Sequence, residues 1–286
     1  MPEALKQPAT LGEMLRGFSM ELSPKEMKVI DAACEQLDPG THVYLTWIPG
    51  EDPFLAVPAA AALQRGGLVP VPHIGARHVE SEAQLSEFVA RLRGEAGVDR
   101  LLVLAGDREK PAGPYDWSLP VMESGILQRN EITKIGISGF PEGNPNIPEP
   151  LLSNSLAAKV EYGRRAGFDL TIVTQFCFEV PPIIQWLGTL RASGIDVPVR
   201  IGVAGPASLI TLTRYAMKCG VGASLRALTH NPSFARLLTE KGPEPIIREL
   251  GTQLSLNGNF GVQGIHFFVF GGLKKTVEWI KSSRAA

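Results

Sequence analysis

A carboxylate inside an otherwise apolar, β-forming segment is the sharpest chemical signal in this sequence. Glu21 lies in the segment Phe18–Leu22, which we expect to be a strand buried on both faces. Burial disfavours the ionised carboxylate, so its pKa should rise toward the range of a general acid near neutral pH. Glu21 is therefore a candidate general acid. The alternative is a structural ion pair with a lysine or arginine.

Two more polar groups interrupt or follow apolar segments. Asp107 comes directly after Gly106, behind the segment Arg100–Leu104. Glycine there lets a ligand approach the backbone and sets a carboxylate at the edge of a pocket, although Gly-Asp is also an ordinary turn. Gln175 lies inside Leu170–Phe178, where its amide needs a partner such as the edge of a heterocycle or a second core group.

A further segment, 139–145 (GFPEGNP), combines two glycines with two prolines, which fix an unusual backbone. Phe140 offers a flat face for a conjugated ligand there, and a plain rigid loop is the alternative. The sequence has no dinucleotide fingerprint, P-loop, HExxH or paired CxxC. His73 stands alone at a strand end, whereas His42 and His266 fall at expected strand starts. We therefore predict no metal site.

Eight apolar segments, spaced at helix-plus-strand intervals, must position these groups. They are Phe18–Leu22, His42–Trp47, Leu68–Ile74, Arg100–Leu104, Lys134–Ser138, Leu170–Phe178, Pro198–Val203 and Gly264–Phe270. Strands that alternate with helical stretches indicate βα units and a parallel sheet. Eight such units are what a closed barrel requires, with its chemistry at the carboxyl ends of the strands. We predict an α/β fold, a single (β/α)8 TIM barrel domain over residues 1–286.

The intervening helices are also legible. Helical patterns are predicted over about 24–37, 81–93, 153–165, 181–193 and 207–219. The long stretch between the seventh and eighth strands predicts extra helices around 225–228, 234–241 and 244–255. A polar loop over 106–118 directly follows the fourth strand, where long loops usually cover or form a site and are otherwise decorative.

Composition limits the classes of function. The chain has 286 residues, of which 44% are hydrophobic and 20% charged, and its net charge of −1 gives no sign of a nucleic-acid or anionic-membrane partner. No signal-peptide pattern or membrane-spanning apolar run is evident. Three cysteines without a CxxC pair predict reduced thiols and a cytoplasmic location. We also expect a homo-oligomer.

Taken in order, several of these segments resemble the methylenetetrahydrofolate reductases, over nearly the whole chain. The resemblance rests on 19–24 (SMELSP), Pro72-His73, Gly106-Asp107, 140–145 (FPEGNP) and 172–178 (IVTQFCF), with 265–268 (IHFF) as a weaker sixth motif. It implies an oxidoreductase of one-carbon metabolism and methionine biosynthesis. In this family NADH or NADPH reduces FAD, which then delivers hydride to 5,10-methylenetetrahydrofolate to give the 5-methyl form. The direction used in the cell is left open.

The resemblance also implies roles for individual residues. Glu21 matches the general acid that helps to open the folate ring at N10, and Asp107 matches a carboxylate that tunes flavin and pterin. The substrate-binding positions are Glu21, Gln175 and Tyr215. The FAD-binding positions are Thr46, His73, Ala105, Gly106, Asp107, Phe140, Asn144 and Lys159.

The chain departs from the family pattern where the family has cations or polar groups. The departures are Ala105 for an arginine, Phe140 for a tyrosine, Asn144 for a histidine, and Gly271-Gly272 for Asn-Arg. Arg77, Arg108 and Lys159 are candidates to hold FAD instead. Three alternatives stay open. They are a flavin-independent enzyme that transfers hydride directly from NAD(P)H, a related flavin barrel that acts on another pterin or amine, and a non-catalytic barrel that binds folate or flavin.

Overall fold

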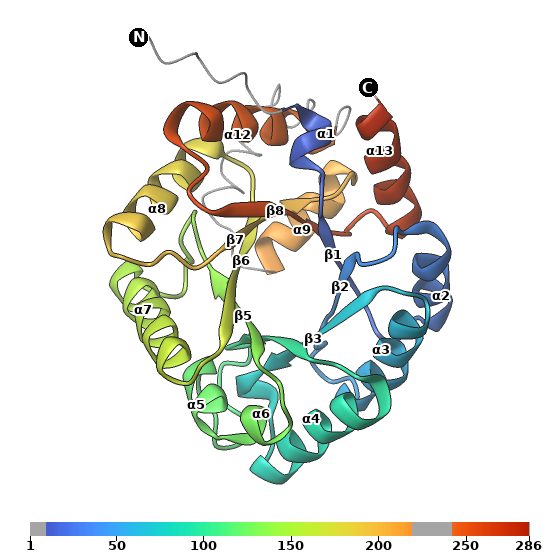
Figure 1. Ribbon diagram of the computed structural model, residues 1–286, viewed down its shortest axis with the longest axis vertical. Helices are drawn as coiled ribbons and strands as arrows, with labels where there is room; N and C mark the ends of the chain where they lie inside the picture. Colours follow the sequence, from blue (N-terminus) through green and yellow to red (C-terminus); the bar gives the residue numbers. More distant parts are fainter. Residues whose placement is uncertain (1–9, 219–241, 286) are drawn as a thin grey trace. The chain divides into compact units, whose positions relative to one another are not determined.

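The computed structural model describes residues 10–218 and 242–285, and it contains a closed barrel of eight strands in chain order (Figure 1). The strands are β1 Ser19–Leu22, β2 His42–Leu45, β3 Val69–Gly75, β4 Arg100–Leu104, β5 Lys134–Gly139, β6 Asp169–Cys177, β7 Val199–Ala204 and β8 Val262–Phe268. All eight predicted segments form strands, so the (β/α)8 prediction is confirmed. The boundaries differ by at most a few residues.

The helices follow the strands as expected. They are α1 Leu11–Met14, α2 Met27–Gln36, α3 Ala56–Arg65, α4 Glu82–Ala96, α5 Ser118–Glu123, α6 Ile126–Arg129, α7 Glu149–Arg165, α8 Val180–Ala192, α9 Leu209–Lys218, α12 Glu244–Asn257 and α13 Leu273–Ala285, with short 3-10 helices η1 Pro53–Leu55 and η2 Ala76–His78. The extra helix predicted over 244–255 is therefore present as α12. The stretches 225–228 and 234–241 lie outside the described residues.

Two helix starts differ from the predictions. Helix α2 begins at Met27, because Pro24 and Lys25 form a turn that the Ser23 hydroxyl stabilises by accepting the Lys25 N–H at 3.3 Å. Helix α7 begins at Glu149, four residues earlier than predicted, since Pro150 is tolerated in a first helical turn.

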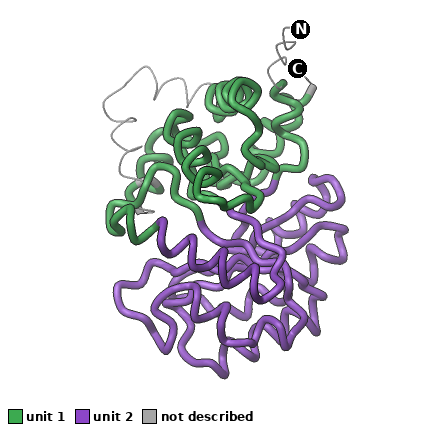
Figure 2. Tube along the Cα trace, turned by 60° about the vertical axis from the view of Figure 1, so that its left-hand side comes forward, with its two compact units in different colours: residues 1–18, 139–152, 174–286 green, residues 19–138, 153–173 purple. Residues whose placement is uncertain are grey.

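The chain divides into two compact units, which Figure 2 colours separately. Unit 1 comprises residues 1–18, 139–152 and 174–286, and unit 2 comprises residues 19–138 and 153–173. Strand β6 contributes residues to both. The prediction of one domain over residues 1–286 stays a prediction.

The strand register of unit 2 decides which side chains share a face. Glu21 pairs with Tyr44, and Tyr44 pairs with Val71. Tyr44 and Val71 belong to a buried cluster with Leu102 and Val173. Side chains alternate along a strand. Glu21 and His73, which lies two residues after Val71, therefore project on the same face as this cluster.

Candidate active site

In unit 2, the predicted acid lies next to a histidine. Glu21 Oε1 is 3.8 Å from His73 Nε2, and the two side chains are 16% and 6% exposed. This distance suits an ion pair when the imidazole is protonated and is longer than a hydrogen bond. The ring of Tyr44 meets the imidazole edge-on at 6.0 Å. Glu21 therefore has a titratable imidazole beside it.

A hollow lies at the carboxyl ends of β2 and β3. It is a shallow depression, and both Thr46 and His73 line it. Trp47 and Phe88, whose rings meet edge-on at 5.2 Å, form part of its wall. The structure therefore brings two of the predicted FAD-binding side chains to one concave surface.

The predicted Ala105–Asp107 segment brings in a histidine that the sequence analysis missed. Asp107 Oδ1 is 2.7 Å from His78 Nε2. Gly106 has φ +90°, and a Cβ there would come within 2.7 Å of the His78 ring. The two glycines that border this ring, Gly75 and Gly106, were the available sequence signal, since both directly adjoin strand ends.

The loop over 106–118 is held by Arg77. Its guanidinium donates hydrogen bonds to the carbonyl oxygens of Arg108 at 2.6 Å, Asp116 at 2.7 Å, and Glu109. Its backbone N–H also bonds to the Ala105 carbonyl at 2.8 Å. Because backbone carbonyls occupy this guanidinium, Arg77 organises the loop, and the hypothesis that it holds FAD gains no support.

Lys159 lies in α7 and is a buried cation. It is 4% exposed, and burial lowers its pKa to about 8. No hydrogen-bond or ion-pair partner of its ammonium occurs among the residues that the structure describes. An uncompensated buried charge is costly, so this position fits an anionic group such as a phosphate.

In unit 1, the segment after β5 forms a tight turn. The Gly143 N–H bonds to the Phe140 carbonyl at 3.0 Å, and Gly143 has φ +73°. The Asn144 side-chain oxygen accepts the Asn146 N–H at 2.9 Å. The two predicted FAD-binding residues, Phe140 and Asn144, are therefore carried on a fixed turn.

Glu142 in this turn has a role that the sequence analysis did not assign. Its Oε1 accepts the N–H groups of Phe178 at 2.7 Å and Glu179 at 2.9 Å, at the start of α8. Its Oε2 is buried without a hydrogen-bond partner among the described residues. Burial raises the pKa of this carboxyl to about 7, against the lowering effect of the two hydrogen bonds.

The ends of β6 and β8 and the helix α9 in unit 1 carry a group of rings that we call the aromatic cluster: Phe176, Phe178, Tyr215, Phe268 and Phe270. Tyr215 stacks on Phe270 with ring centroids 4.1 Å apart and an interplanar angle of 11°. Phe176 meets both Phe268 and Phe270 edge-on at about 5 Å. Gln175 adjoins the cluster through its neighbour Phe176.

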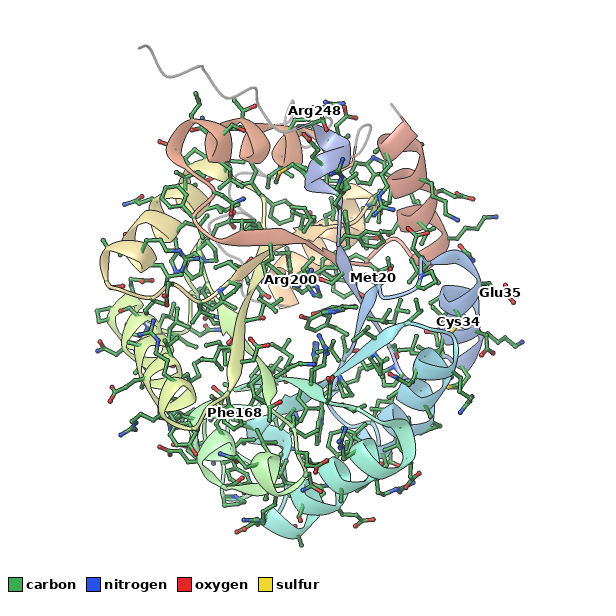
Figure 3. The ribbon with its side chains drawn as sticks, in the orientation of Figure 1. Met20, Cys34, Glu35, Phe168, Arg200 and Arg248 are labelled. Atoms are coloured by element: carbon green, nitrogen blue, oxygen red, sulfur yellow. The ribbon has the colours of Figure 1, made fainter. Side chains whose placement is uncertain are left out.

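The aromatic cluster depends on a glycine in β7, the strand whose Arg200 is labelled in Figure 3. A Cβ on Gly202 would come within 2.8 Å of Phe268 Cε2 and 2.5 Å of the Thr174 carbonyl oxygen. Gly202 therefore leaves room for Phe268. Tyr215, a predicted substrate-binding residue, lies against Phe270 in the same cluster. Phe268 and Phe270, two positions apart at the end of the last strand, were the overlooked signal.

One histidine assignment was wrong. His266 is the fifth residue of β8, fully buried, with its ring 5.2 Å from that of Phe268. The strand begins two residues earlier than predicted, which moves His266 away from the strand start. In the described part of the chain, no three His, Cys, Asp or Glu side chains gather as a metal site, and no helix is long and apolar enough to cross a membrane.

This protein is a TIM barrel with ionisable side chains near the carboxyl ends of its strands, which is where TIM-barrel enzymes have their active sites. The family model "Methylenetetrahydrofolate reductase" matches residues 35–270, and the chain belongs to this family. It is 28% identical over 175 residues to methylenetetrahydrofolate reductase 2 of Saccharomyces cerevisiae, covering 56% of this chain and 26% of that protein. It is 27% identical over 205 residues to methylenetetrahydrofolate reductase 1 of Schizosaccharomyces pombe, covering 65% and 31%.

Two further comparisons show how much of each similar protein the chain covers. The 5,10-methylenetetrahydrofolate reductase of Pectobacterium carotovorum is 25% identical, over 55% of this chain and 51% of that protein. The chain thus spans from about a quarter to half of the length of these relatives. A solved structure of an uncharacterised Clostridium thermocellum protein that binds two copies of 5-methyl-5,6,7,8-tetrahydrofolic acid has the same fold. Its TM-score is 0.62, at 14% identity, over 98% of both chains.

Proposed function

We propose that this barrel interconverts 5,10-methylene- and 5-methyltetrahydrofolate, with NADH or NADPH as the hydride source and FAD as the carrier. The observation that carries the proposal is the carboxyl of Glu21 in the barrel wall, 3.8 Å from His73. Family membership and the named relatives support the same reaction. The folate that the Clostridium thermocellum protein binds supports a folate ligand.

Glu21 donates a proton to N10 in this proposal. The tertiary aryl amine at N10 must gain a proton to leave, and a desolvated glutamate can supply it near neutral pH. His73 lies close enough to stabilise the carboxylate that remains. Gln175 offers amide groups to the edge of the pterin, and Tyr215 offers a ring face to the flat part of the substrate.

The described residues fit FAD. Lys159 is a buried ammonium without a described partner, which suits a phosphate, and Thr46 and His73 share a hollow. We propose that these three hold FAD together with Ala105, Gly106, Asp107, Phe140 and Asn144. The chemistry that FAD supplies when bound is hydride acceptance from NADH or NADPH and hydride donation to the folate.

Flavin-independent hydride transfer is the second candidate. It is favoured by the missing cations at Ala105 and Gly272, and by the loop carbonyls that occupy the Arg77 guanidinium. A non-catalytic binding barrel is the third. The partly buried carboxyl of Glu21 argues against it, since binding alone does not require the cost of desolvating this group.

The absorption spectrum of the purified protein, before and after reconstitution with FAD, separates these candidates. We expect a bound flavin that NADH or NADPH bleaches and that methylenetetrahydrofolate reoxidises. A colourless protein that takes up no FAD yet reduces the folate with NAD(P)H would establish direct transfer. A protein that binds folate without turnover under any of these conditions would establish the binding barrel.

We further propose that the protein works in the cytoplasm, in methionine biosynthesis, as a homo-oligomer of single-domain barrels. The free thiols Cys34 and Cys177 support a reducing compartment. Light scattering of the purified protein tests the homo-oligomer, which a monomeric mass at working concentration contradicts.

A further inference from the structure

Asp107 is solvent-exposed, and yet its carboxylate is held in one place by a buried imidazole. The Asp107 side chain is 59% exposed, whereas that of His78 is 6% exposed, and their Oδ1 and Nε2 atoms are 2.7 Å apart. A hydrogen bond of this length fixes the carboxylate rotamer. Most exposed aspartates have no such restraint.

The imidazole itself occupies a slot lined by glycine. A Cβ on Gly75 would come within 3.0 Å of His78 Cδ2, and a Cβ on Gly106 within 2.7 Å. Gly106 also needs its positive φ of +90°, which other residues rarely adopt. The two segments are joined by the backbone hydrogen bond from Arg77 to Ala105. The slot therefore sets the imidazole and the carboxylate against each other as one unit.

We propose that His78 is a positioning residue for Asp107 in the hydride-transfer reaction. This inference rests on the proposed function, in which Asp107 lies near the flavin. The imidazole N–H donates a hydrogen bond that stabilises the negative charge of Asp107 and fixes the orientation of its carboxylate. A bare carboxylate beside a flavin opposes the negative charge gained on reduction, and a hydrogen-bonded carboxylate opposes it less. His78 thus supplies charge compensation at a site where Ala105 replaces the family's arginine.

Four proteins test the inference: the parent, His78→Leu, Asp107→Asn, and the double variant. Leucine has no hydrogen-bond donor, whereas glutamine would keep an N–H for Asp107. We expect His78→Leu to lower the midpoint potential of bound FAD and Asp107→Asn to raise it. Adding His78→Leu to Asp107→Asn should have no further effect, because the charge to be compensated is gone. The folate half-reaction of His78→Leu should slow by about tenfold to a hundredfold, the usual worth of a hydrogen bond to a charged group.

The matched control is His42→Leu, at the start of β2, where the imidazole lies 3.2 Å from the Arg100 guanidinium. It should leave the potential unchanged. The ¹⁵N chemical shift of His78 Nε2 in the flavin-free protein should move on Asp107→Asn, and that of His42 should not. An unmoved His78 resonance, or equal drops in potential with and without Asp107, would overturn the role of His78.

Failure of the proposed function has a different signature. If the parent protein takes up no FAD but reduces the folate directly, the kcat and KM of the same four proteins are compared instead of the midpoint potentials. Non-additive losses then support His78 as the partner of Asp107, and additive losses overturn it. A parent protein without turnover in either assay overturns both the proposed function and this inference.

Discussion

The two compact units carry opposite kinds of candidate residue. Unit 2 supplies ionisable groups, namely Glu21, His73, His78, Asp107 and Lys159. Unit 1 supplies the aromatic cluster, in which five rings pack against one another. Buried ionisable groups cost stability, whereas packed rings add to it. The ionisable region therefore indicates chemistry, and the aromatic cluster indicates recognition of a flat ligand.

The strongest test of this contrast is Glu21→Gln. General acid catalysis typically contributes 10²–10⁴-fold, so the folate half-reaction should slow by about that factor. Flavin reduction by NAD(P)H needs no proton at N10 and should survive nearly intact. Stopped-flow absorbance follows the two halves separately. Equal slowing of both, or no slowing of the folate half, would make Glu21 structural.

Lys159→Met tests whether the buried charge of Lys159 lowers the free energy of unfolding of the ligand-free protein. The pKa of Lys159 is lowered from 10.5 to about 8, so the cost of its buried charge is present below pH 8 and fades as the pH rises from 8 to 10.5. Methionine should therefore stabilise the ligand-free protein at pH 7 by up to about 3 kcal/mol. Affinity for FAD should fall at the same time.

Urea unfolding and FAD titration measure these two effects of Lys159→Met. The control is Lys28→Met, which replaces an exposed lysine in α2 and should change neither quantity. A destabilised Lys159→Met protein with unchanged FAD affinity would show that the ammonium has a structural partner.

Glu142 is the ionisable exception in unit 1, and its pH dependence sharpens the comparison. Its pKa is raised from 4.5 to about 7, so the folded protein keeps a proton that the unfolded chain releases between these values. Stability should therefore fall as the pH rises from 4.5 to 7, by roughly 2–3 kcal/mol. Glu142→Gln keeps an oxygen to accept the Phe178 and Glu179 N–H groups, and it should abolish this dependence. Urea midpoints across this range report it, and an unchanged slope would contradict the assignment.

The sequence predicted the barrel because each strand is a local apolar pattern, and local patterns need no knowledge of distant partners. It missed the contact of His78 with Asp107, since the two residues are 29 positions apart and neither neighbourhood indicates the other. The start of α2 was wrong for a local reason, the hydrogen bond from Lys25 to Ser23. Glu21 could be singled out as a candidate because a carboxylate inside an apolar segment is visible in one strand alone.

The aromatic cluster was only partly foreseen for the same reason. Tyr215 was assigned from a resemblance, whereas its partner Phe270 comes from a segment after β8 and becomes visible only in three dimensions. Gly202 carries no chemical group, so nothing in the sequence indicated that it makes room for Phe268. Local sequence patterns do not predict how segments that are distant in the chain pack against each other.

The smallest expected effect concerns recognition by the stacked pair. Phe270→Leu removes the ring that holds Tyr215, the proposed folate contact, in place. An aromatic pair contributes about 0.5–1.5 kcal/mol beyond burial, so losing this order should weaken folate binding by at most roughly two- to tenfold. The loss should appear in KM or Kd and leave the proton-dependent step unchanged, because the ring of Phe270 carries no ionisable group. Tyr215→Phe keeps the stack and is the matched control, with binding close to that of the parent. If Phe270→Leu instead slowed the chemical step while affinity stayed constant, the division between an ionisable region for chemistry and an aromatic cluster for recognition would be wrong.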